Sequence, residues 1–228
     1  MTARKDESAI RRALQGGDPG GQGASAATRR QAGEDAAKAA ARLTARVAAD
    51  GLADISYARV DSPFGALTVA STNRGLVRLA FPEESLDGVL ARLAERISPR
   101  IVEAPAQLDA VRRELDEYFG GARRDFALAL DRQLIGPFAT RVLGVASAIP
   151  YGTTLTYLEV AGRAGNPRAP RAAGNALGSN PIPIVIPCHR VLRKGGSVGG
   201  YGGGPARKRW LLELEGALAR AGRSGRAS

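Results

Sequence analysis

The chain has 228 residues, of which 44% are hydrophobic, and a formal net charge of +11. This length allows one or two domains with a sizeable core, and no apolar run approaches the ~18 residues that a membrane helix needs. The opening residues lack the apolar core of a signal peptide, and a single free cysteine suits a reducing compartment, so we expect an intracellular protein with no membrane partner.

The basic excess lies almost wholly in the second part of the chain. Residues 134–228 hold 13 Lys and Arg against three acidic residues, whereas residues 1–133 hold 20 against 19. A polyanion such as DNA is therefore the expected partner. A basic surface that contacts only solvent is the alternative, which this asymmetry disfavours.

Residues 1–50 are predicted to be a low-complexity, disordered extension. The stretch 15–23 is rich in Gly, and the stretch 34–49 is rich in Ala, Arg and Lys with few large apolar side chains. Such compositions bury too little apolar surface to fold. The second stretch could form a frayed helix, because Ala is the best helix former.

Residues 55–132 are predicted to form a small α+β domain with an antiparallel sheet and a structural role. Turn residues at 63–65 and 73–75 separate short strands, over residues 57–62, 66–71 and 76–81. Helical spacing of apolar residues follows over 86–97 and 108–119. A further strand is expected over 126–130.

Residues 134–218 are predicted to form a mainly helical domain, and residues 219–228 a basic tail. The spacing predicts four helices, over residues 138–148, 157–164, 171–177 and 206–218. Thr156 can cap the second helix, and Pro170 can open the third. The tight Gly turn between these two helices is typical of a helix-turn-helix. An extended loop is expected over 181–191.

The only cysteine and the only histidine are adjacent, in Ile186-Pro187-Cys188-His189-Arg190-Val191. Two such residues cannot complete the roughly four ligands of a structural zinc site, so we expect no metal and no cofactor. A nucleophile beside its base is one interpretation; a small buried hydrophobe is the other, which composition alone favours. Neighbouring side chains of an extended segment point to opposite faces, so a water would have to relay a proton from Cys188 to His189.

Several motifs of the second domain occur in the order and at the spacing of one known family. They are Ile149-Pro150-Tyr151-Gly152, Thr156-Tyr157, Ala169-Pro170-Arg171-Ala172-Ala173-Gly174, Asn180-Pro181, the cysteine motif, Gly199-Gly200-Tyr201, Lys208, and Leu211-Leu212 with Glu215-Gly216. Through them the chain resembles the O6-alkylguanine-DNA alkyltransferases, or methylated-DNA–protein-cysteine methyltransferases. The resemblance is strong over residues 149–216, weak over 55–148 and absent over 1–50.

The resemblance implies a winged helix-turn-helix-like catalytic domain that repairs DNA by direct damage reversal. Such an enzyme binds duplex DNA through the minor groove, flips out the O6-alkylguanine, and moves the alkyl group once onto its own cysteine. O4-alkylthymine is a further candidate substrate. The implied protein is a monomer without a cofactor, in the bacterial cytoplasm at the nucleoid, with double-stranded DNA as its partner.

The resemblance also assigns four catalytic residues. Cys188 would attack as the thiolate, and His189 would take its proton through a water. Glu215 would hold the imidazole in the required tautomer, as in a catalytic triad. Tyr157 would hydrogen-bond the guanine and help the leaving O6 to accept a proton.

Further residues are assigned to DNA and to the pocket. Arg171 would fill the place of the flipped base, and the small Ala172 and Gly174 would let their helix approach the groove, with Thr154 as another DNA contact. The pocket and its support would comprise Asn180, Val191, Tyr201, Gly202 and Lys208. In this set Asn180 would brace a turn through side-chain-to-backbone bonds, Val191 would offer its carbonyl to the base, and Gly202 would offer only its backbone N–H where some members carry a hydroxyl.

Two other functions stay open at this point. A non-catalytic lesion-binding relative would carry another residue in place of Cys188. A cysteine hydrolase would need an oxyanion hole, and the adjacent placement of cysteine and histidine disfavours it.

Overall fold

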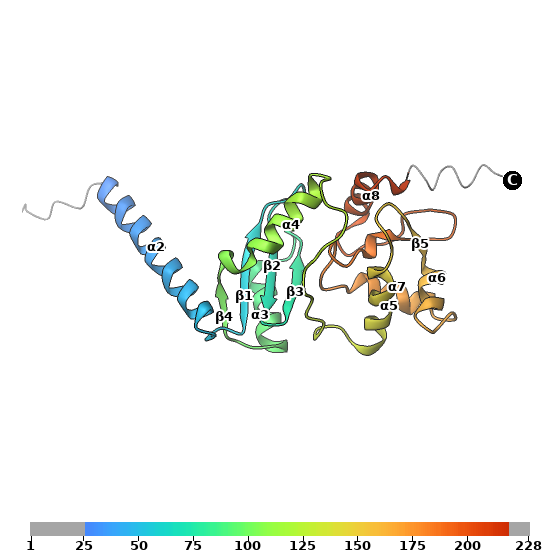
Figure 1. Cartoon of the computed structure of the whole chain (residues 1–228), viewed down its shortest axis with the longest axis horizontal. Helices are drawn as coiled ribbons and strands as arrows, with labels where there is room; N and C mark the ends of the chain where they lie inside the picture. The colour runs from blue at the N-terminus through green and yellow to red at the C-terminus, as the bar shows by residue number, and fades with distance from the viewer. Residues whose placement is uncertain (1–25, 219–228) are drawn as a thin grey trace, which may run out of the picture. The chain divides into compact units, whose positions relative to one another are not determined.

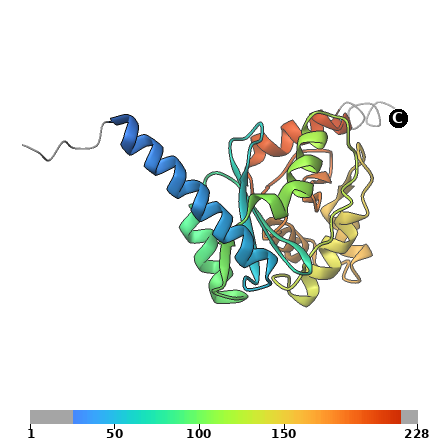
Figure 2. The same cartoon turned by 60° about the vertical axis from the view of Figure 1, so that its left-hand side comes forward.

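The computed structural model describes residues 26–218 (Figures 1 and 2). These residues fall into two compact units divided after Leu43. Helix α2 (Ala26–Ala49) begins in the first unit and ends in the second. No helix in this described range is long and apolar enough to cross a membrane.

Residues 26–49 form one helix, which agrees with the helix considered for 34–49 and differs from the expected disorder over 26–33. Alanine occupies many of the helix positions, and side-chain pairs one turn apart add support, Arg30 to Glu34 and Gln31 to Asp35. The rest of the predicted extension (1–25) and the predicted tail (219–228) lie outside the described residues.

The N-terminal domain is built on a four-stranded sheet in the order β3-β2-β1-β4. Its strands are β1 (Ile55–Val60), β2 (Leu67–Thr72), β3 (Gly75–Ala80) and β4 (Ile101–Glu103). The first three form the predicted antiparallel meander, but β4 pairs parallel with β1. The parallel pair arises because a helix carries the chain back between β3 and β4. The strand predicted over 126–130 is only an isolated bridge, Leu76 with Leu130.

Helices cover both faces of this sheet, α3 (Leu86–Arg96) behind it and α4 (Asp109–Phe119) in front of it in Figure 1. The Ser85 hydroxyl caps α3, whose buried Val89 and Leu93 pack with sheet residues in a small core. A 3-10 turn, η1 (Pro105–Leu108), precedes α4. The buried side chains of α4 belong to the main core, which continues into the second domain.

The second domain is mainly helical, and the predicted helices are present within a few residues. Its elements are α5 (Pro137–Ser147), β5 (Leu155–Thr156), α6 (Tyr157–Arg163), α7 (Pro170–Gly178), η2 (Cys188–Arg190), β6 (Val191–Leu192) and α8 (Pro205–Leu214). Thr156 and Glu159 form a capping box at the start of α6. Strands β5 and β6 form a parallel pair.

Two predictions about the end of this domain are wrong in detail. The segment 181–191 is not extended throughout, because Cys188, His189 and Arg190 form the 3-10 turn η2, in which the Arg190 amide donates to Pro187. The last helix ends at Leu214 rather than Leu218. Glu215 is its C-cap residue, and the following Gly216 has a positive φ of 67°, which ends a helix readily.

The close approach of Gly75 to the segment 126–131 can be tested by mutation. Its φ is +127°, and a Cβ there would lie 2.2 Å from the Ala129 carbonyl oxygen, whereas at Gly121 (φ +76°) a Cβ would meet no atom within 4 Å. We expect Gly75→Ala to cost about 3 kcal/mol of unfolding free energy, and Gly121→Ala only about 1 kcal/mol. Urea unfolding measures both, and equal losses would contradict the close approach.

Candidate active site around Cys188

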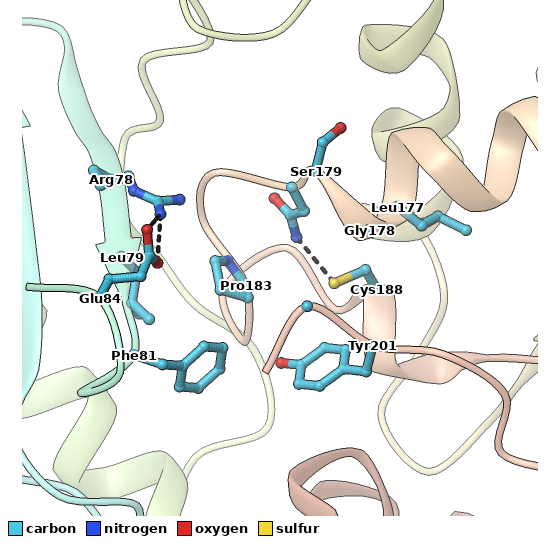
Figure 3. A pocket seen from close by; sticks show the side chains of 12 residues that line it. Arg78, Leu79, Phe81, Glu84, Leu177, Gly178, Ser179, Pro183, Cys188 and Tyr201 are labelled. Carbon is cyan, nitrogen blue, oxygen red and sulfur yellow. Dashed lines mark hydrogen bonds and ion pairs between the residues drawn. The ribbon is translucent and has the colours of Figure 1, made fainter. Parts of the chain in front are cut away.

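Cys188 is 4% exposed and is held by Asn180 at the end of α7. The Asn180 amide nitrogen donates to the Cys188 sulfur at 3.1 Å, the bond drawn in Figure 3, and to the Ile186 carbonyl at 2.9 Å. Its oxygen accepts from the Ile182 amide at 3.0 Å. One side chain therefore braces the loop and places the sulfur.

The Cys188 thiol is neutral in the resting protein. Burial raises its pKa to about 11, against the opposing effects of the Asn180 hydrogen bond and the Lys208 charge. The thiolate is the nucleophilic form. A reaction at this sulfur therefore needs a group that removes the proton.

His189 is fully buried and is paired with Glu215. Its Nε2 lies 3.0 Å from Glu215 Oε1. An ionised carboxylate only accepts hydrogen bonds, so we assign the proton of the imidazole to Nε2. Nδ1 is then a buried acceptor, with no partner among the described residues. Burial lowers the pKa of His189, which keeps the ring neutral and able to take up a proton at Nδ1.

Besides His189, three groups donate to Glu215. Arg190 donates to both carboxylate oxygens, each at 2.9 Å. The Tyr118 hydroxyl donates at 2.7 Å to Oε1, and the Gly152 amide at 3.3 Å to Oε2. Burial alone would raise the pKa of Glu215, but hydrogen bonds from His189 and Arg190 lower it to about 2.

The roles of Tyr118 and Arg190 at Glu215 were not predicted from the sequence. Arg190 was part of the cysteine motif, so its place beside the histidine was the available signal. Tyr118 is 97 residues from Glu215 along the chain, and no local pattern links the two.

A cavity of 550 Å³ opens onto Cys188 beside the helix-turn-helix. Five of the predicted residues line it with the cysteine, namely Tyr157, Arg171, Gly174, Tyr201 and Gly202. Leu177, Arg193 and Gly200 also line it but were not predicted. Arg171 and Arg193 are both exposed, and neither pairs with an acidic group of the described chain.

A second cavity, of 260 Å³, reaches Cys188 from the side of the N-terminal domain (Figure 3). Strand β3 and the turn after it contribute Arg78, Phe81 and Glu84, and Arg78 forms an ion pair with Glu84. The two cavities share lining residues of α7, the cysteine itself and the Tyr201-Gly202 loop. The site thus receives residues from the domain to which the sequence assigned only a structural role.

Lys208 supports the loop beside Tyr157. Its ammonium group donates to the Val191 carbonyl, to the Gly200 carbonyl at 3.2 Å and to the Tyr157 hydroxyl at 3.4 Å. The Tyr157 hydroxyl in turn donates to the Gly200 carbonyl at 3.2 Å. Burial lowers the pKa of Lys208 to about 8.

Three residues that were predicted to contact DNA or the flipped base line neither cavity. Thr154 is half-buried in the loop before β5, and Ala172 is exposed on α7. Their contacts with DNA stay predictions. Val191 is fully buried, and its carbonyl accepts from Lys208; the carbonyl has a second lone pair, and its contact with a base stays a prediction.

The low pKa of Glu215 can be tested through the pH dependence of the protein's stability. A carboxyl whose pKa is lower in the folded protein than in the unfolded chain stabilises the fold at neutral pH, and this contribution is lost as the pH falls from about 4.5 towards 2. We expect Glu215→Gln to cost about 3 kcal/mol at pH 7 and to flatten the acid limb of a stability–pH curve. Glu213→Gln, at an exposed neighbouring position, should leave the curve unchanged; the same curve for both variants would contradict the anchoring.

Two protein-family models match the chain. The DNA-binding domain of 6-O-methylguanine DNA methyltransferase matches residues 137–217, and the ribonuclease-like domain of the same enzymes matches residues 55–132. A methylated-DNA–protein-cysteine methyltransferase of Mycobacterium tuberculosis is 39% identical over 161 residues, 71% of this chain and 92% of the relative. The constitutive enzyme of that name from Bacillus subtilis is 32% identical, over 70% of this chain and 94% of the relative.

A solved structure is similar as well. The crystal structure of Mycobacterium tuberculosis OGT in complex with DNA has a TM-score of 0.62 and 38% identity, and the match covers 72% of this chain and 94% of that one. Similarity at this identity over nearly the whole length of the relatives establishes common descent. The chain therefore belongs to the O6-alkylguanine-DNA alkyltransferase family.

Proposed function

We propose that this protein repairs DNA by direct damage reversal, with one transfer of a methyl or other alkyl group from O6 of guanine to its own Cys188. The observation that carries the proposal is the buried Cys188 thiol, which opens onto a cavity beside a helix-turn-helix and lies next to the His189–Glu215 pair. Relatives named methylated-DNA–protein-cysteine methyltransferase support it, as does the relative solved with DNA.

The alkyl group becomes reachable when the damaged base leaves the stack. A base inside a duplex cannot be attacked in line, so the nucleotide turns out into the 550 Å³ cavity. Arg171, exposed on α7 at the rim of this cavity, fills the gap in the duplex. Small residues on the same helix, Ala172 and Gly174, let it approach the minor groove.

The transfer itself is a displacement at the alkyl carbon. The Cys188 sulfur forms a bond to that carbon as the bond from carbon to O6 breaks, and the electron pair of the broken bond stays on O6. The thiol proton passes through a water to Nδ1 of His189, and Glu215 stabilises the imidazolium that results. The Tyr157 hydroxyl assists protonation of the leaving guanine. The thioether is stable, so the reaction occurs once.

The oligomeric state, the cellular location and the range of substrates are part of the same proposal. We infer a monomer that acts on double-stranded DNA in the bacterial cytoplasm, at the nucleoid, with O4-alkylthymine as a further candidate substrate. The excess of basic residues in the second domain favours phosphate contacts, and the lone free cysteine suits a reducing compartment.

The first prediction for this function is stoichiometric methylation of Cys188. After incubation with an O6-methylguanine duplex, mass spectrometry of the Cys188 peptide should show a permanent gain of one methyl group, and each protein molecule should repair one lesion. Cys188→Ala should lose transfer but keep duplex binding, because the thiol makes no phosphate contact. Tight binding without methylation of the wild type would instead support a lesion-binding protein, and ester hydrolysis with turnover would support a hydrolase.

The second prediction separates flipping from chemistry. Arg171→Ala should slow transfer from duplex DNA much more than transfer from free O6-benzylguanine, which needs no flipping. Binding should weaken modestly, with a change of about one in the slope of log affinity against log salt.

Arg168→Ala is the matched control for Arg171→Ala. Arg168 is exposed in the turn before α7 but lines neither cavity. This variant should change the salt slope at most and leave both transfer rates intact. Equal slowing on duplex and free base for Arg171→Ala would show that Arg171 does not act in flipping.

A further inference from the structure

Tyr118 connects the N-terminal domain to the proton-accepting pair. It lies on α4, is fully buried, and its hydroxyl donates to Glu215 Oε1 at 2.7 Å. Burial, with the nearby Glu215 charge, raises the pKa of Tyr118 far above its usual value. The hydroxyl therefore keeps its proton and acts towards the carboxylate only as a donor.

We propose that Tyr118 is a positioning residue that sets the proton affinity of His189 by sharing Glu215 Oε1 with it. Oε1 accepts from three groups, His189, Arg190 and Tyr118. The three donors share the negative charge of one oxygen. The hydrogen bond from Tyr118 therefore weakens the hydrogen bond that Glu215 accepts from His189 Nε2–H. This inference rests on the transfer of the Cys188 proton to His189 proposed above. It gives the N-terminal domain, through Tyr118, a part in that transfer.

The arrangement requires the hydroxyl and not only the ring of Tyr118. The ring is held by edge contacts with Phe119 and Tyr151 and a tilted contact with Phe126, which a phenylalanine could reproduce. Tyr151 shows the contrast, because its hydroxyl donates to the Leu214 carbonyl at 3.1 Å and not to Glu215. A matched control is thus available within the same cluster.

Other charged and titratable groups also lie close to the His189–Glu215 pair. Arg190 and Lys208 carry positive charge towards His189 and lower its pKa, whereas Glu215 raises it. Tyr201 faces the His189 ring with centroids 6.4 Å apart, and Tyr151 is close enough to Glu215 for its own pKa to be raised. Cys188 is adjacent along the chain. Of these groups only Tyr151 is altered in the variants below, as the control.

His189 is the only histidine of the chain, so its NMR signals need no assignment by mutation. In the full-length protein we expect Tyr118→Phe to raise the His189 pKa by about one unit. The Nε2–H proton should move downfield, since the less-shared carboxylate accepts from it more strongly. Tyr151→Phe should change neither quantity.

The same variants should be tested in transfer from free O6-benzylguanine. A more basic His189 should favour loss of the thiol proton and raise the plateau rate, and because His189 itself is protonated more readily, the acid limb of the pH–rate curve of Tyr118→Phe should shift to higher pH. A shifted His189 pKa with an unshifted rate curve would support the link from Tyr118 and overturn the relay instead. An unchanged Nε2–H shift and pKa, with reduced stability alone, would overturn the proposal about Tyr118.

A second variant covers the case in which Tyr118→Phe does not fold. 3-Fluorotyrosine at position 118 keeps the ring and the hydroxyl but is a stronger hydrogen-bond donor. The proposal then requires shifts of opposite sign, a lower His189 pKa and an upfield Nε2–H proton. An unchanged or opposite response would contradict it.

Discussion

The carboxylate of Glu215 is the constraint on which the rest of the site depends. A buried charge is costly unless its hydrogen-bonding capacity is filled, and this one accepts from His189, Arg190, Tyr118 and the Gly152 amide. These donors come from η2, from α4 and from the turn after α5. The Arg190 guanidinium also donates to the Ile149 carbonyl. One buried anion thus joins both domains at the turn that carries the cysteine.

Burial acts in opposite directions on the two reacting side chains. It raises the pKa of Cys188 and lowers that of His189, so both are neutral at rest. A standing thiolate would be open to alkylation and oxidation by small molecules, which would waste a protein that acts once. In the proposed reaction charge develops only when a base fills the cavity, and Glu215 is already placed for the imidazolium. The resting state therefore protects the nucleophile without removing its base.

The features that could be predicted from the sequence are those whose cause lies in a few neighbouring residues. Thr156 with Glu159, and Pro170 at the start of α7, are local signals, and both helices begin where they indicate. The adjacent Cys188 and His189 were identified from residue types alone. The second cavity and the Tyr118 contact could not be predicted, because they arise where segments about a hundred residues apart pack together. The parallel pairing of β4, a strand of three residues, has no periodicity to reveal it.

The N-terminal domain holds the catalytic turn from two sides. On one side the Leu79 amide and the Arg78 guanidinium both donate to the Pro181 carbonyl. Pro181 follows Asn180, the residue that places the Cys188 sulfur. On the other side Tyr118 reaches Glu215 behind His189. The base is therefore linked to this domain through one residue, Glu215, and the sulfur through two, Asn180 and Pro181. Such short connections explain how a domain without reacting groups can govern the geometry of the transfer.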